Sequence, residues 1–228
     1  LYELAGAPIL DYHAVEQGGK IVGTATPWQE AEKANWKNPD ELKNASEFFA
    51  VHAWLNNRDA IGAGSENPMD NQRWVNGHMT TMDAGGALMF GGMGGTKDFA
   101  GDASEWDSLR DPKKNKSTAA VFGHMTGEQL YASAQLLKKI QPADVEGLVD
   151  EFAGEGLAGH DKQKIVATLL ARRDAILAKA EQFNPKKKVN GHIDGNTGLY
   201  TEDEVGNSAE HDAKMEAADA ALATPNLV

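Results

Sequence analysis

The chain has 228 residues, 41% of them hydrophobic, and a formal net charge of −12. This length can bury one good core, and the negative charge argues against nucleic acid or an anionic membrane as a partner, because both would repel the chain. The sequence has no cysteine, which excludes disulfides, thiolate metal sites and cysteine nucleophiles, and no long apolar run. We therefore expect a soluble protein of a reducing compartment, the cytoplasm.

The first part of the chain predicts the end of a helix followed by a hairpin. Residues 1–6 carry apolar side chains at helical spacing and finish with a glycine suited to a left-handed stop, so this helix is expected to lack its beginning. Residues 9–16 and 21–25 predict two strands joined by a tight turn over 17–20. Because a lone two-stranded hairpin is marginal in water, we expect it to pair with something upstream.

The next segment predicts a loop and then a helix. Residues 27–44 are polar, with Trp28 and Trp36 as their only large apolar groups, and are expected to form a loop with one helical turn. From Pro39 onward a helix is expected, with Asp40 near its start. Its end delivers the run Asn57-Arg58-Asp59, and its buried face comprises Leu42, Phe48, Phe49, His52, Ala53 and Leu55.

A second hairpin is the clearest local signal in the chain. Residues 72–75 and 78–82 flank Asn76-Gly77, a pair that suits a type I′ turn. This hairpin is expected to place Asp83 at its exit. A glycine run follows, too dense for regular structure and suited to a backbone packed close to a ligand: Gly85, Gly86, Gly91, Gly92, Gly94 and Gly95.

The remainder up to Phe183 predicts helices. Residues 104–110 suit a short helix, and Thr126 with Gln129 forms a capping box that opens a helix to Ile140. Pro142 fits the first turn of a helix to Phe152, and Asp161 is a candidate cap for a long helix to Phe183.

Three residues are spaced as in a phosphoryl-transfer centre: Asp59, Asn67 and Asp83. Such a centre needs a carboxylate near the attacking hydroxyl and hard oxygen ligands that hold Mg²⁺ on the phosphates. Under this hypothesis Asp59 orients or deprotonates the acceptor, and Asn67 and Asp83 bind the metal. The alternative is ordinary turn chemistry at all three positions, since Asp and Asn before Gly or Pro are common turn residues.

Other polar residues support weaker hypotheses. His52 and His78 with the two aspartates are candidates for a zinc site, but no His-x-x-x-His pair supports it, and His52 on an apolar helix face is more often a hydrogen-bonded core residue. Arg172-Arg173 are candidates for phosphate binding, although pairing with Asp174 or Glu181 is the more ordinary use.

A string of segments in this order resembles the C-terminal lobe of a protein-kinase-like phosphotransferase. The closest branch contains HipA-like, actin-fragmin-kinase-like and phosphatidylinositol-kinase-like domains, including copies attached to bacteriophage head and portal-associated proteins. The resemblance covers roughly residues 1–183 and is carried by residues 52–67, 82–90, 94–99, 108–112, 119–123 and 170–174.

The resemblance implies a role for each matching residue. Asp59 corresponds to the catalytic aspartate, Asn67 to the metal-binding asparagine of the catalytic loop, and Asp83 to the metal-binding aspartate that takes the place of the kinase Asp-Phe-Gly aspartate. Gly85 and Gly86 fall in the cofactor-binding segment. The implied function is phosphoryl transfer of the protein- or lipid-kinase type, with ATP and Mg²⁺ as cofactors.

This sequence also departs from that pattern. Such phosphotransferases use an upstream phosphate loop and a strand lysine that pairs with the nucleotide phosphates, and neither is in this chain. Lys20, in the first hairpin turn, is a poor substitute and is expected to be a solvated charge. Either an N-terminal lobe was removed or lies on another polypeptide, or the lobe is a non-catalytic structural or assembly protein, such as a phage virion component.

These readings predict an α+β chain in four parts. Residues 1–28 are the remnant of an N-lobe hairpin and hinge, 29–42 an interlobe linker, 43–183 a mostly helical kinase-like C-lobe, and 184–228 an extended or docking tail. The expected partners are a nucleotide and another chain, or a missing lobe, that covers residues 1–25. We expect the chain to be part of an assembly, in the cytoplasm or alternatively in a phage virion.

Overall fold

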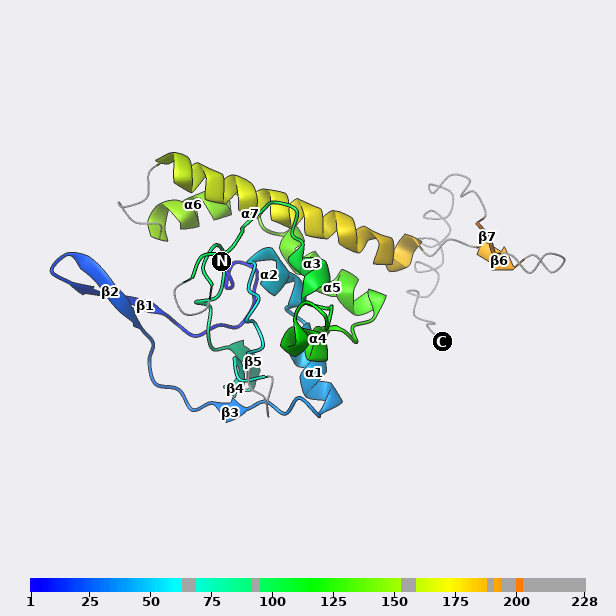
Figure 1. Cartoon of the computed structure of the whole chain (residues 1–228), viewed down its shortest axis with the longest axis horizontal. Coiled ribbons are helices and arrows are strands. Elements are labelled where there is room, and N and C mark those ends of the chain that lie inside the picture. Colours follow the sequence, from blue (N-terminus) through cyan, green and yellow to red (C-terminus); the bar gives the residue numbers. More distant parts are fainter. Residues whose placement is uncertain (63–68, 92–94, 153–158, 188–190, 194–199, 203–228) are drawn as a thin grey trace, which may run out of the picture. The chain divides into compact units, whose positions relative to one another are not determined.

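The structure is a computed structural model that describes residues 1–62, 69–91, 95–152, 159–187, 191–193 and 200–202. These residues contain seven α-helices and small antiparallel sheets, which confirms the predicted α+β class. The chain divides into two compact units, Leu1–Asn184 and Pro185–Val228 (Figure 1). Among the residues just given, no helix is both long enough and apolar enough to cross a membrane.

The N-terminal segment forms hydrogen-bonded turns rather than the expected helix end. The Ala5 N–H donates to the Leu1 carbonyl at 3.2 Å, and Gly6 adopts the predicted left-handed conformation with φ of 77°. The chain then runs beside a later strand, because the Thr81 N–H donates to the Pro8 carbonyl at 3.1 Å and Ile9 forms a parallel bridge with Thr81.

That bridge shortens the first predicted strand. Strand β1 (His13–Gln17) begins four residues later than expected and pairs with β2 (Lys20–Ala25), which confirms the hairpin. Gly18 and Gly19 have φ of 60° and 74°, so the turn uses the conformation that glycine tolerates best. In Figure 1 this ribbon projects from the helices, and its two strands form a sheet of their own within the described residues.

The segment predicted as a loop over 27–44 contains a short strand that was not expected, and the helix predicted from Pro39 onward forms. Strand β3 (Glu32–Lys33) adds an edge to the second hairpin, and helix α1 (Pro39–Ser46) starts within it. The cap is Asn38, whose side chain accepts a hydrogen bond from the Asp40 N–H, with Pro39 in the first turn. Asp40 lies in the first turn, near the start of the helix as predicted.

The expected single helix up to Asp59 is two helices. Phe48 leaves the helical conformation, with φ of −99° and ψ of 17°, between α1 and α2 (Phe49–Trp54). All six residues of α2 are buried, which explains why all of them except His52 are apolar.

The second hairpin forms as predicted. Strands β4 (Gln72–Val75) and β5 (His78–Thr81) are joined by Asn76 and Gly77, with φ of 50° and 79°. Positive φ at both central residues is what a type I′ turn requires. Asp83 follows β5 as expected.

The helical part matches the prediction with one addition. Helices α3 (Glu105–Ser108) and α6 (Pro142–Phe152) form within or at the predicted bounds, and α5 (Gly127–Lys138) opens with the predicted capping box of Thr126 and Gln129. The added helix is α4 (Lys116–Phe122), capped by Asn115. Helix α7 (Gly159–Ala180) begins two residues before Asp161 and continues as the 3₁₀ turn η2 (Glu181–Phe183).

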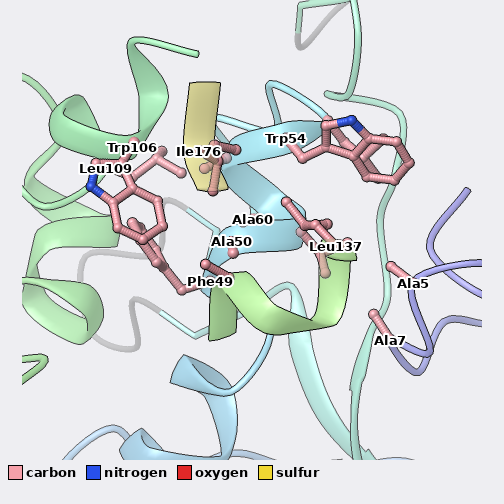
Figure 2. Close-up of a cluster of buried hydrophobic side chains, with 14 of the residues drawn as sticks. Ala5, Ala7, Phe49, Ala50, Trp54, Ala60, Trp106, Leu109, Leu137 and Ile176 are labelled. Atoms are coloured by element: carbon pink, nitrogen blue, oxygen red, sulfur yellow. The ribbon is translucent and has the colours of Figure 1, made fainter. Parts of the chain in front are cut away.

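The core lies around α2. Helix α7 packs against α2, α5 and α6, and in Figure 1 it is the long yellow helix beside α6. The Phe49 ring lies 5.0 Å from that of Trp106 and 5.1 Å from that of Phe122, and the Trp54 Nε1–H donates to the Leu169 carbonyl at 2.8 Å. Figure 2 shows Phe49 and Trp106 on one side of the cluster and Trp54 on the other, so α2 and the loop that follows it are held on both sides.

The second unit has little described structure. It contains the 3₁₀ turn η3 (Pro185–Lys187) and the antiparallel strands β6 (Gly191–Ile193) and β7 (Tyr200–Glu202). The rest of the segment predicted as a tail, 184–228, lies outside the described residues.

Candidate functional site

The loop that carries Asp59 is fixed from the N-terminal segment. The Asn57 side chain accepts a hydrogen bond from the Asp59 N–H at 3.1 Å and donates one to the Tyr2 hydroxyl at 2.8 Å. Tyr2 in turn lies 3.1 Å from His52 Nδ1 on α2. Because Tyr2, His52 and Asn57 are all buried, this chain of hydrogen bonds sets the position of the Asp59 backbone from inside the protein.

His52 is a core residue, as the ordinary interpretation predicts. It is 1% exposed, and burial lowers its pKa to about 3, so the ring is neutral. His78 lies at the exposed start of β5. In the part of the chain that the structure describes, no three His, Cys, Asp or Glu side chains gather closely enough to hold a metal ion by themselves.

Asp83 closes a short turn at the exit of β5. Its Oδ1 accepts a hydrogen bond from the Gly85 N–H at 2.7 Å. One carboxylate oxygen therefore stabilises a turn, as the alternative interpretation of Asp83 as an ordinary turn residue expected. Asp83 and Gly85 are exposed. The Tyr12 hydroxyl donates to the carbonyl of Met82, which anchors the residue just before Asp83.

The structure brings Asp59, Asp83, Gly85 and Gly86 together. A Cβ on Gly86 would lie 3.4 Å from the Asp59 Cβ, so the turn after Asp83 packs directly on Asp59. Burial raises the pKa of the Asp59 carboxyl, and the negative charge of Asp83 raises it further. Asn71, which also donates to the Asp59 carbonyl at 2.7 Å, opposes this rise, as does the charge of Lys97. Asn67 lies outside the described residues.

Sequence reasoning missed Lys97. Its Nζ donates to the carbonyl of Asn56, ahead of Asp59, and to the carbonyl of Gly86, after Asp83. Burial, and then the positive charge of Arg58, lower the pKa of Lys97 to about 8. The only sequence signal was its position in residues 94–99, one of the segments that carry the resemblance.

An ion cluster formed by Glu105, Arg172 and Arg58 supports the same loop. Arg172, 1% exposed, pairs with Glu105 at 2.5 Å and donates to the carbonyls of Ala53 and Trp54 at 2.6 and 2.7 Å. Arg58 pairs with the other Glu105 oxygen at 2.8 Å. Burial alone would raise the pKa of Glu105, but the hydrogen bonding and charge of Arg172, with hydrogen bonding from Arg58, hold the pKa below its ordinary value.

These contacts bear on the two uses considered for Arg172 and Arg173, which were phosphate binding and pairing with Asp174 or Glu181. Arg172 is enclosed by protein groups on α2 and α3, so it is not available to a phosphate. Its neighbour Arg173 pairs with Asp174 at 2.8 Å, as the ordinary interpretation expected.

Two shallow hollows lie elsewhere on the molecule. They measure about 370 Å³ and 520 Å³, and both are lined by Trp74 and Gly77 of the second hairpin. Neither is lined by Asp59 or Asp83.

The site therefore consists of two aspartates on adjoining loops, a glycine turn packed on one of them, and a lysine that joins both loops. Carboxylates in this arrangement can hold a hard cation and orient a hydroxyl. No family model, curated protein or solved structure matches the chain, so the functional conclusion depends on the residues themselves.

Proposed function

We propose that the chain carries the catalytic lobe of an ATP- and Mg²⁺-dependent phosphotransferase of the protein- or lipid-kinase type. The observation that carries the proposal is the contact between the Asp83 turn and Asp59. This contact packs the Asp83 turn on Asp59, and the charge of Asp83 acts on the Asp59 carboxyl. Phosphoryl transfer requires this combination of a metal ligand and a group that orients the acceptor.

Each residue has a role in the proposed reaction. Asp59 accepts a hydrogen bond from the acceptor hydroxyl and takes its proton, for which a raised pKa is suitable. Asp83 and Asn67 would supply carboxylate and amide oxygens to Mg²⁺, and the ion would neutralise charge on the phosphates. Gly86 leaves the space beside Asp59 free of a side chain, and Gly85 presents an exposed backbone to the nucleotide.

The donor set fits this cation. Mg²⁺ prefers oxygen ligands, keeps several waters, and needs only one or two carboxylates when substrate phosphates complete its coordination. Asp83 is exposed and uses Oδ1 in the Gly85 hydrogen bond, an arrangement that orients the carboxylate before any ligand arrives.

Transfer of label from [γ-³²P]ATP tests the proposal. The assay uses the full natural polypeptide that contains these residues, with Mg²⁺ and without it, and Asp59→Asn and Asp83→Ala as variants. We expect each variant to lose about 100-fold or more of the rate. Asp40→Asn, an exposed first-turn residue of α1, is the matched control and should keep the wild-type rate. Unchanged transfer by Asp83→Ala would exclude the metal role.

A second candidate function, a structural or assembly protein, is favoured by the β1–β2 ribbon. This ribbon and the segment after it expose large apolar side chains, with Val22 59% and Trp28 93% exposed. Exposed apolar groups on an edge suit a contact with another chain. Light scattering during size-exclusion chromatography tests this candidate: an assembly function predicts a complex or self-association that Val22→Lys with Trp28→Lys abolishes, and a monodisperse monomer with a protease-resistant ribbon would exclude it.

A further inference from the structure

The glycine segment and the Asp59 loop are joined by side chains that the proposed reaction does not otherwise use. Asn56 adopts a left-handed conformation with φ of 55°, and its Nδ2 donates to the carbonyls of Leu88 and Asp98 at 2.8 and 2.7 Å. The Leu88 N–H donates to the Leu55 carbonyl at 2.6 Å. The segment that follows Asp83 is thereby attached to the end of α2.

Lys97 adds a second attachment between the same two parts of the chain. One ammonium donates to the carbonyl of Asn56 and to that of Gly86, and the Lys97 backbone N–H donates to the Met89 carbonyl at 2.9 Å. An ammonium has three donors on a single atom, so it can bridge two carbonyls that face each other. Both carbonyls belong to loops that carry proposed site residues.

The charge around Lys97 is balanced by several groups. Arg58 and Arg172 oppose a positive charge there, whereas Glu105 and Asp59 favour it. Because the lysine is partly buried, its bonds to carbonyls are protected from competing water better than those of an exposed lysine.

We propose that Lys97 is a positioning residue: its ammonium holds the Asp83–Gly86 turn on the Asn56–Asp59 loop, so that Asp59 and Asp83 keep the separation that transfer requires. The bridge itself is inferred from geometry alone, whereas its effect on catalysis rests on the proposed function. Misplacement of a reacting group by about 1 Å can cost about 100-fold in rate. Loss of the bridge should therefore lower kcat much more than it lowers the fraction of folded protein.

The test has two arms and four proteins: wild type, Lys97→Met, Lys97→Arg and Lys138→Met. The methionine variant keeps most of the stem and removes the donors, arginine restores donors, and Lys138 is an exposed lysine in the last turn of α5 that serves as the matched control. The first arm measures amide hydrogen exchange in residues 84–91. We expect Lys97→Met to accelerate exchange of the Leu88 N–H by about tenfold or more, without a change in α5.

The second arm measures kcat and KM for ATP per folded molecule. We expect Lys97→Met to lower kcat by about 100-fold, Lys97→Arg to recover at least part of it, and Lys138→Met to behave as wild type. Unchanged exchange in Lys97→Met would overturn the bridge, and faster exchange with an unchanged kcat would overturn the positioning role. If wild type transfers no phosphate, the proposed function fails, and the exchange arm still decides whether Lys97 joins the two loops.

Discussion

The buried His52 makes a prediction about stability and pH that requires no ligand. Its folded pKa of about 3 lies below the ordinary value of 6.5, so the unfolded chain binds a proton more readily in this interval. The stability that neutral His52 contributes is therefore fully present above pH 6.5, the ordinary pKa of the unfolded chain. It is lost as the pH falls toward the folded pKa of about 3. Between about pH 8 and about pH 5 the loss is about 1.5 pKa units, or about 2 kcal/mol of unfolding free energy.

Urea unfolding over this pH interval measures the loss. His52→Asn removes the titrating ring, and its amide can reach toward the Tyr2 hydroxyl that the ring contacts. We expect this variant to be less stable at neutral pH, because it leaves a cavity, but to lose about 2 kcal/mol less than wild type on acidification. His124→Asn, an exposed histidine, should keep the wild-type pH dependence. An unaltered pH dependence in His52→Asn would refute the assignment of His52 as a neutral core residue.

Two further pairs of substitutions test burial and backbone packing by chemical denaturation. Arg172→Met should cost about 3–5 kcal/mol, because it leaves the Glu105 carboxylate, 2% exposed, without its closest partner. Arg173→Met breaks a pair with the exposed Asp174 and a hydrogen bond to the Ile140 carbonyl, and should cost less, about 1–2 kcal/mol. Equal losses would contradict the burial argument. Gly62→Ala should lower the free energy of unfolding more than Gly19→Ala. Both residues have positive φ, but a Cβ would lie 3.0 Å from the Asn71 backbone nitrogen at Gly62 and would meet nothing within 4 Å at Gly19. A larger loss at Gly19 would contradict this comparison.

Local signals in the sequence predicted the elements that local chemistry determines. Asn76-Gly77 specified its hairpin, and Thr126 with Gln129 specified the start of α5, because turn and cap residues act through neighbours a few positions away. The cap of α1, Asn38, was not among the predicted caps, although Pro39 favours the first helical position and therefore a cap just before it.

The site was only partly predictable for a physical reason. Asp59 and Asp83 were proposed from their spacing and from the resemblance, but the partners that hold their loops lie far away in the sequence. Arg172 contacts Trp54 across 118 positions, and Lys97 reaches Asn56 across 41. No helical or strand periodicity encodes such contacts, because they depend on how α7 and the glycine segment pack on the end of α2.

Binding of Mn²⁺ and ATP, followed by the electron paramagnetic resonance signal of free Mn²⁺, tests most directly whether Asp83 belongs to a metal–nucleotide site. Mn²⁺ accepts the same oxygen ligands as Mg²⁺ and reports its own binding. We predict that wild type and Asp40→Asn bind the pair equally well, and that Asp83→Asn weakens binding by about tenfold or more, corresponding to about 1.4 kcal/mol or more. Equal affinity in Asp83→Asn and wild type would contradict the proposed site.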